Sequence, residues 1–101
     1  MTDLLEAYLK NKGIELQKEY RFHKVRKWRI DLYFESGEKK IGIEIEGGVW
    51  TGGRHTRGAG FTKDMEKYNS AGLQGIIILR FTPQQIKANK EIELISILLG
   101  D

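Results

Sequence analysis

The sequence predicts a single α/β domain in which a mixed β-sheet is flanked by helices. Three observations support this prediction: helical spacing of apolar residues at the N-terminus, two alternating apolar–polar segments around a short turn, and an apolar run that follows a second helical segment. The predicted order of elements is α-β-β-β-α-β-α. The chain of 101 residues suits one compact domain over residues 1–101, because a chain of this length forms one core.

The spacing of apolar residues at the N-terminus predicts the first helix. Apolar side chains recur there at Leu4, Leu5, Tyr8 and Leu9. Thr2 suits the N-cap of this helix, and Gly13 marks its end. A short strand is expected next, over residues 19–23.

Two further strands are predicted from the alternation of their side chains. The first carries Trp28, Ile30, Leu32 and Phe34 on one face, and the second carries Ile41, Ile43 and Ile45. A two-residue turn at residues 37–38 places Asp31 opposite Glu44, whereas a turn at residues 36–37 places Asp31 opposite Gly42. Both registers have the same parity, so Asp31 and Glu44 share a face in either one.

The second half of the chain predicts a loop, a helix, a strand and a final helix. Residues 47–60 hold six glycines and are expected to form the loop, and a helix follows over residues 61–73. The apolar run at residues 76–81 is typical of a strand that is buried on both faces. A Thr-Pro pair at residues 82–83 begins the last helix, whose continuity is in question at Asn89.

The composition limits the classes of function. Lys and Arg number 17 and Asp and Glu number 14, so the net charge is +3, which suits an anionic partner without requiring one. The absence of cysteine excludes disulfides, thiolate zinc sites and a cysteine nucleophile. No apolar run approaches the roughly 20 residues that span a membrane, and the N-terminus lacks the pattern of a signal peptide. We therefore expect a cytoplasmic protein without membrane association.

A cluster of carboxylates is predicted on the hairpin. Asp31, Glu44 and Glu46 share one face, and like charges this close repel each other unless a cation lies among them. Mg²⁺ and Mn²⁺ take oxygen ligands of this kind. The pattern indicates a metal site, and an exposed hairpin face that happens to carry acids fits it equally well.

A basic segment precedes the hairpin. Its Lys and Arg side chains are Arg21, Lys24, Arg26, Lys27 and Arg29, and aromatic residues lie among them. Arg and Lys bind phosphates, and aromatic rings stack on bases. Such a run is usually a solvated face. Beside an acidic metal site it suits phosphodiester cleavage, because basic groups can hold the nucleic-acid backbone there.

The glycine-rich loop adds Arg54, His55 and Arg57. Glycines let a backbone approach a phosphate closely, but the loop lacks the GxGxxG and GxxxxGK(S/T) patterns of nucleotide sites, so an NTPase is rejected. His55 suits a general base or a group that positions water, although a single loop histidine is more often incidental. Lys63 and Lys67 lie four apart on one stripe of the following helix, which either faces solvent or points one lysine into the site.

These motifs resemble the PD-(D/E)XK nuclease superfamily, which has a restriction-endonuclease-like fold with an α-β-β-β-α-β core. The resemblance covers nearly the whole chain. It is nearest to the small phage and bacterial nucleases of the VRR-NUC type, and it extends to small endonucleases related to very-short-patch repair. The segments that carry it are WRID (28–31), IEIEGG (43–48), GRHTRG (53–58), FTKDMEKYN (61–69) and LRF (79–81).

The resemblance implies the ligands of a Mg²⁺ or Mn²⁺ ion. Asp31 matches the aspartate of the motif and Glu44 its second acid, and both would bind the metal together with the carbonyl of Ile45. Glu6 on the first helix matches an acid that some members use as an outer ligand.

The main departure from the family pattern is Glu46, which stands where the family usually has a lysine. The resemblance implies that Lys63, Lys67 or His55 takes the role of that lysine, and Lys67 is our preference. The missing lysine affects the protonation step more than it affects metal binding.

The sequence therefore predicts a Mg²⁺- or Mn²⁺-dependent DNA endonuclease. The resemblance suggests branched DNA, such as a Holliday junction cut by a homodimer, and nicking of damaged or mismatched duplex is the second option. A non-catalytic DNA-binding module on the same fold is the competing class. Glu46 supports that class, and the pair of Asp31 and Glu44 opposes it, because acids that face a phosphate weaken binding. A structural or partner-binding protein would leave the basic segment and the carboxylates unexplained.

Overall fold

A computed structural model describes residues 2–47 and 59–101, with residues 59–63 described by their backbone alone. The helices and strands are α1 (Asp3–Asn11), β1 (Gln17–Arg21), β2 (Arg29–Ser36), β3 (Lys39–Ile45), α2 (Ala59–Leu73), β4 (Ile76–Phe81), α3 (Pro83–Lys87) and α4 (Lys90–Leu98). The order of elements is the one predicted, with the C-terminal helix divided in two.

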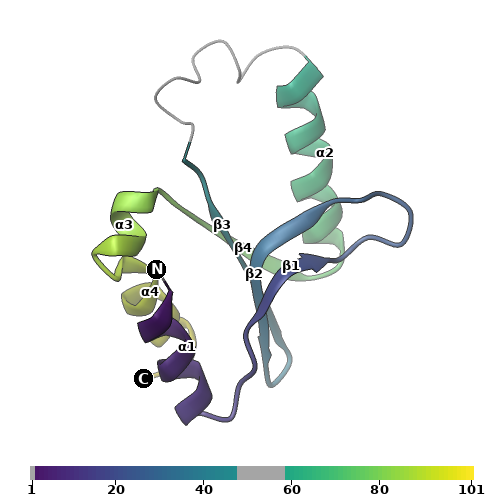
Figure 1. Cartoon of the computed structure of the whole chain (residues 1–101). Helices are drawn as coiled ribbons and strands as arrows, with labels where there is room; N and C mark the ends of the chain where they lie inside the picture. Colours follow the sequence, from purple (N-terminus) through teal and green to yellow (C-terminus); the bar gives the residue numbers. More distant parts are fainter. Residues whose placement is uncertain (1, 48–58) are drawn as a thin grey trace.

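The four strands form one mixed sheet in the order β1-β2-β3-β4. The first three strands pair antiparallel, and β4 pairs parallel to β3 after the crossover through α2. Helices α1, α3 and α4 cover one face of the sheet, and α2 covers the other (Figure 1). The predicted α/β class with a mixed sheet flanked by helices is thereby confirmed.

The face under α1, α3 and α4 holds the larger core. Its buried residues are Leu5, Leu9, Leu32, Phe34, Ile41, Ile43, Phe81, Ile86 and Ile95. The smaller core under α2 consists of Phe22, Ile30, Tyr33, Ala71 and Ile76. Burying each such side chain contributes about 1.5–3 kcal/mol, so both faces of the sheet depend on helix packing for their stability.

Ile30 lies on the face of α2, and its predicted position beside Leu32 and Phe34 is wrong. A Cβ built on Gly42 would lie 3.0 Å from Ile30 Cγ2, which places Ile30 on the Gly42 side of the sheet. The strand that pairs with β2 is irregular at this point. Glu19 of β1 has a φ of 52° and lies between the residues paired with Ile30 and Leu32. The regular alternation of faces that the prediction assumed therefore does not hold between Ile30 and Leu32.

The hairpin of β2 and β3 has the register that a two-residue turn at residues 37–38 produces. Ser36 pairs with Lys39, and Leu32 pairs with Ile43. Gly37 has a φ of 61°, a conformation that glycine adopts without steric cost. One step beyond the last paired residues, this register brings Asp31 opposite Glu44.

Two predicted features of the second half have different outcomes. The break in the C-terminal helix is confirmed, because Asn89 takes a left-handed conformation with a φ of 58° between α3 and α4. The prediction that β4 is buried on both faces is wrong, since Ile77 is 39% exposed. The strand lies at the edge of the sheet and has a neighbour on one side only. Its apolar run reflects partial burial and not a central position.

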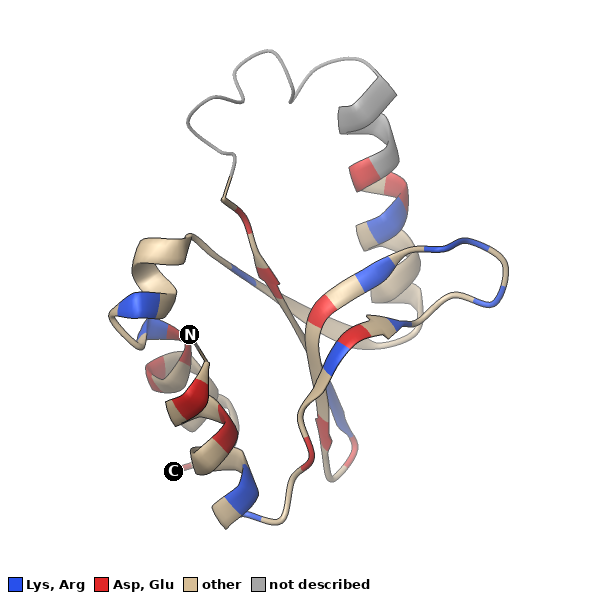
Figure 2. Ribbon diagram, in the orientation of Figure 1, with Lys and Arg blue, Asp and Glu red and all other residues tan. Residues whose placement is uncertain are grey.

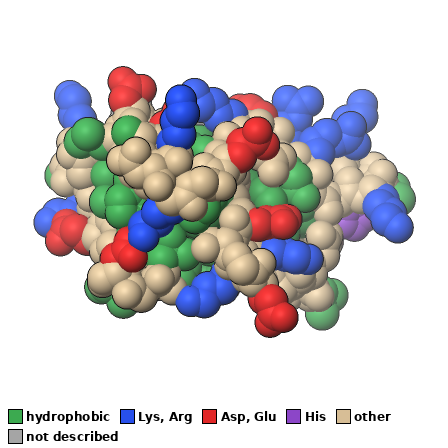
Figure 3. Space-filling view, turned by 90° about the horizontal axis from the view of Figure 1, so that it is seen from below, with side chains coloured by type: hydrophobic (Ala, Val, Ile, Leu, Met, Phe, Trp, Pro, Cys, Tyr) green, Lys and Arg blue, Asp and Glu red, His purple; other side chains and the backbone are tan. Residues whose placement is uncertain are grey.

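No helix within residues 2–47 and 59–101 is long and apolar enough to cross a membrane. Seen from below, side chains of both charges lie interspersed with hydrophobic ones over this face of the molecule (Figure 3).

Candidate functional site

Two carboxylates adjoin each other on the sheet face that α2 covers. Asp31 lies near the start of β2 and Glu44 near the end of β3. Asp31 Oδ2 accepts a hydrogen bond of 2.7 Å from the backbone N–H of Ile45. The Asp31 side chain thus fastens β2 to β3 just beyond their last backbone pair, and this bond holds its carboxylate beside Glu44.

Glu44 is a buried carboxylate, only 5% exposed. Its pKa is raised from 4.5 to about 7, chiefly because burial disfavours the charged form; Lys67 lowers the pKa and Asp31 raises it. Lys67 Nζ on α2 lies 2.5 Å from Glu44 Oε1. One lysine therefore compensates the buried charge in part, and the two carboxylates together still favour a further cation.

Glu46 belongs to a second, adjoining group. Its Oε1 accepts from Arg80 Nε at 2.9 Å and lies 2.6 Å from Arg80 Nη2, and the Tyr68 hydroxyl donates to the same oxygen at 3.3 Å. The Arg80 guanidinium lies over the Tyr68 ring, 4.8 Å from its centre. The hydrogen bond to Glu46 raises the pKa of Arg80. Burial, then the charges of Glu44 and Glu46, raise the pKa of Tyr68, so its hydroxyl remains a donor.

The structure does not bring Glu6 into a group with Asp31 and Glu44. Glu6 lies on α1, a helix of the opposite sheet face, and its Oε1 is 3.0 Å from Lys18 Nζ on β1. Ile45 lies beside Asp31 through its backbone N–H.

Several residues singled out in the sequence lie outside the described part of the structure. They are Arg54, His55 and Arg57. Lys63 lies on α2, and its side chain is not described. Of the two lysines on the helix stripe, Lys67 is thus the one whose position is defined, and it points to Glu44.

The carboxylate pair has the donor chemistry of a site for a hard divalent ion. Among the described residues, no group of three or more His, Asp or Glu side chains is arranged to hold a metal. Mg²⁺, however, commonly keeps several waters and uses one or two carboxylates together with substrate phosphates. Asp31 and Glu44 fit that requirement, because they provide two adjoining carboxylates on neighbouring strands.

The basic segment forms an ordered loop between β1 and β2 that lies beside α2 (Figure 2). His23 Nδ1 accepts from the backbone N–H groups of Val25 and Arg26 at 3.1 and 2.9 Å. Arg26 lies over the Trp28 ring, 5.0 Å from its centre, and 3.7 Å from Glu66 of α2. Glu66 is next to Lys67 in the chain, so one helix carries both the contact to this loop and the contact to Glu44.

The side chains of this loop are available to a ligand. Lys24, Arg26 and Lys27 of the loop are exposed, and so are Arg21 at the end of β1 and Arg29 at the start of β2. The apolar Val25 is 81% exposed. A loop of this kind can bind the backbone of a nucleic acid through several separate charges.

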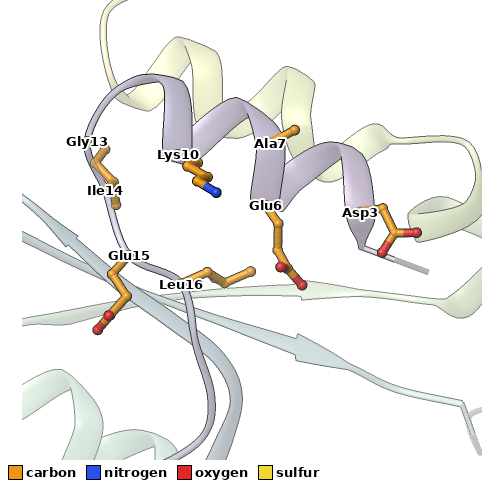
Figure 4. Close-up of a pocket in the computed structure, with 8 residues that line it drawn as sticks. All are labelled: Asp3, Glu6, Ala7, Lys10, Gly13, Ile14, Glu15 and Leu16. Carbon is orange, nitrogen blue, oxygen red and sulfur yellow. The ribbon is translucent and has the colours of Figure 1, made fainter.

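A pocket of about 600 Å³ lies between α1 and the segment that follows it (Figure 4). Neither Asp31 nor Glu44 contributes to it. Its lining residues are Asp3, Glu6, Ala7, Lys10, Gly13, Ile14, Glu15 and Leu16. The pocket is therefore separate from the candidate site.

Two members of the site were not among the sequence-predicted site residues. Arg80 lies within the apolar run of β4, which was interpreted as a buried strand. Tyr68 follows Lys67 in the sequence, and no role was predicted for it. Arg80 pairs with Glu44 in the parallel register of β3 and β4, and this register is known from the structure. The face of α2 that meets the sheet has no signal in the sequence.

Comparisons of the chain with family models, with curated proteins and with solved structures give no match.

Proposed function

We propose that the protein is a metal-dependent endonuclease that hydrolyses the phosphodiester bonds of DNA. The observation that carries this proposal is the pair of Asp31 and Glu44 on neighbouring strands, with Lys67 against Glu44. Two adjoining carboxylates, one of them buried, destabilise the free protein relative to separate acids. Such an arrangement is typical of a site that binds a cation.

In this proposal Asp31 and Glu44 hold a Mg²⁺ or Mn²⁺ ion. Such an ion would polarise the phosphate and activate water at neutral pH. Asp31 is kept in place by the Ile45 N–H and Glu44 by Lys67. The Lys67 ammonium is the described group best placed to donate a proton or a hydrogen bond near the reacting phosphate. His55 remains a proposed partner in that proton transfer.

The basic loop supports DNA as the substrate. The loop and the two strand ends that flank it carry five exposed Lys and Arg side chains. One of them, Arg26, contacts Glu66 of α2, the helix that also supplies Lys67. Positive side chains that neutralise phosphates give nucleic-acid binding that weakens with salt. The proposal adds Arg54, Arg57 and Lys63 to this surface.

The proposed family is the PD-(D/E)XK nuclease superfamily, to which the sequence motifs are similar. The nearest resemblance, to VRR-NUC nucleases, favours branched DNA such as a Holliday junction. A homodimer would be required for paired cuts, because one domain carries one pair of carboxylates. The alternative substrate is damaged or mismatched duplex that receives a single nick.

The second candidate function is a non-catalytic DNA-binding module. Two observations favour it: Glu46 is already paired with Arg80, and the described residues hold no group of three acids for a metal. The adjoining carboxylates of Asp31 and Glu44 oppose it, because a binder gains nothing from acids that face the phosphates.

Cleavage assays with matched variants distinguish the two functions. Labelled four-way junction, linear duplex and single-stranded DNA are each incubated with Mg²⁺, Mn²⁺ or EDTA. The variants Asp31→Asn and Glu44→Gln keep the shape and an acceptor oxygen at each site but remove the charge, and Lys10→Ala on α1 is the control. We expect metal-dependent cutting by the wild type and the control, with loss of at least about a hundredfold in both site variants.

The outcomes lead to different conclusions about the function. Symmetric cuts in the junction would identify a resolvase, and a single cut in mismatched duplex would identify a nicking enzyme. Binding without cutting in every metal, unchanged in Asp31→Asn and Glu44→Gln, would refute the endonuclease and leave the binding module. Thermal unfolding of each variant shows whether a lost activity reflects lost folding.

A further inference from the structure

Arg80 completes a row of charged residues across three neighbouring strands. Glu44 of β3 has Asp31 of β2 as its neighbour on one side, by continuation of the hairpin register, and Arg80 of β4 as its paired residue on the other. Neighbouring strands lie about 4.8 Å apart. The Cα of Arg80 is therefore about as close to the Cα of Glu44 as the Cα of Asp31 is. The Arg80 side chain lies on the sheet face that α2 covers, where it contacts Tyr68.

The Arg80 guanidinium is fixed from two directions. Its Nε and Nη2 both contact Glu46 Oε1, at 2.9 and 2.6 Å, and its Cζ lies over the Tyr68 ring, 4.8 Å from the ring centre. The Tyr68 hydroxyl donates to the same Glu46 oxygen at 3.3 Å, which fixes that carboxylate in turn. A guanidinium held in this way loses little further rotamer freedom when it binds a ligand.

Part of the guanidinium remains free for a ligand. The Arg80 side chain is 52% exposed, and an arginine has five N–H donors in a planar fork. Among the described residues, Glu46 is its only recorded hydrogen-bond acceptor, and it engages Nε and Nη2 alone. The remaining N–H groups suit two oxygens of one phosphate, the geometry in which arginine exceeds lysine.

We propose that Arg80 binds a phosphate group of the DNA next to the carboxylate pair, and that Glu46 and Tyr68 position it for this contact. This inference rests on the proposed nuclease function. It assigns Glu46 a role that differs from that of a metal ligand, because its carboxylate acts through Arg80.

Binding measurements without cleavage test the contact itself. The affinity of a labelled DNA duplex is measured in EDTA over a series of salt concentrations, for wild type, Arg80→Ala, Arg80→Lys and the control Lys10→Ala. We expect Arg80→Ala to weaken binding about ten- to hundredfold and to reduce the salt slope by about one. Arg80→Lys should retain the slope and lose part of the affinity, because an ammonium cannot contact Glu46 and the phosphate in the same planar arrangement.

A double-variant comparison tests the positioning role of Glu46. If Glu46 acts through Arg80, Glu46→Ala lowers kcat in the wild-type background and has no further effect in Arg80→Ala. The Mg²⁺ concentration for half-maximal activity should stay unchanged in Glu46→Ala. A metal ligand would behave differently, because its loss would raise that concentration with or without Arg80.

The results separate this inference from the nuclease proposal. Equal affinity and equal salt slope for Arg80→Ala and wild type would overturn the phosphate contact, even where the wild type cuts DNA. A shifted Mg²⁺ requirement in Glu46→Ala would overturn the positioning role. Absence of cutting by the wild type would refute the nuclease, and the EDTA binding series would still decide whether Arg80 contacts DNA.

Discussion

Lys67 Nζ lies 2.5 Å from Glu44 Oε1, and this contact joins α2 to the end of β3. Both side chains are largely buried, with 17% and 7% of their surfaces exposed. A substitution that removes one partner of this ion pair leaves the other partner as an unpaired buried charge. This costs about 3–5 kcal/mol when the remaining partner stays ionised. The raised pKa of Glu44 provides a way to reduce that cost, because the carboxylate can take up a proton.

The first prediction concerns Lys67 in catalysis. Lys67→Met keeps the length of the side chain and removes its charge, so we expect kcat to fall by about a hundredfold or more. DNA binding in EDTA should change much less, because the three basic residues of the β1–β2 loop and the two that flank it, Arg21 and Arg29, remain. Asn69→Ala, on the same helix and exposed, is the matched control. Full activity in Lys67→Met would show that Lys67 has no part in the reaction.

The second prediction concerns the stability of the metal-free protein as a function of pH. Glu44 has a pKa of about 7 in the folded protein and an ordinary value of 4.5. The folded state therefore holds a proton that the unfolded chain releases between these values, and stability falls as the pH rises through this range. At roughly 1.4 kcal/mol per pH unit, the fall amounts to about 3 kcal/mol.

Glu44→Gln removes this titration and supplies the test. Urea unfolding in EDTA is measured at about pH 5 and about pH 8. Between these two conditions we expect the free energy of unfolding of the variant to rise by about 2.5 kcal/mol relative to that of the wild type. Glu91 is also a buried acid whose pKa is raised by burial. It is present in both proteins and cancels in the difference. Parallel pH profiles for the two proteins would contradict a raised pKa at Glu44.

The neighbourhood of Asp31 and Glu44 could be predicted from the sequence because it depends on two short-range rules. Side chains alternate along a strand, and a two-residue turn fixes the register of a hairpin. Both rules act within a few residues of the turn at 37–38. They failed at Ile30, which packs with Tyr33 on the face of α2 although its spacing predicts the face of Leu32 and Phe34.

The contacts of Lys67 and Arg80 depend on packing over longer distances. The rotation of α2 about its own axis, relative to the sheet, decides that Lys67 reaches Glu44. The parallel register of β4 on β3, set across that helix, decides that Arg80 meets Glu46. The spacing of apolar residues within one element specifies neither the rotation of α2 nor the register of β4 on β3. Each depends on how two elements pack against each other.

The third prediction concerns the basic loop. Lys24 and Lys27 are exposed and belong to no recorded ion pair among the described residues. The double variant Lys24→Ala with Lys27→Ala should reduce the salt slope of DNA binding by about two, because each lysine that contacts a phosphate releases about one counterion. Lys10→Ala on α1 should leave the slope unchanged. An unchanged slope in the double variant would mean that DNA binds elsewhere on the protein.

The last prediction concerns the packing beneath the site, where Gly42 lies between Ile30 and Ile78. A Cβ at Gly42 would lie 3.0 Å from both Ile30 Cγ2 and Ile78 Cδ1, so the side chains must shift to admit it. We expect Gly42→Ala to lower the free energy of unfolding by about 1–2 kcal/mol, as overpacking of a filled core does.

Two further variants show whether this loss comes from crowding. Ile78→Val deletes Cδ1, one of the atoms nearest to the added methyl group, so the double variant should be more stable than the two separate losses would predict. Gly72→Ala on α2 is the control, because a Cβ there meets nothing within 4 Å. That change should raise stability by up to about 1 kcal/mol, since alanine is the better helix former. Urea unfolding is measured for the wild type and all four variants, and strictly additive losses in the double variant would show that Ile78 does not crowd residue 42.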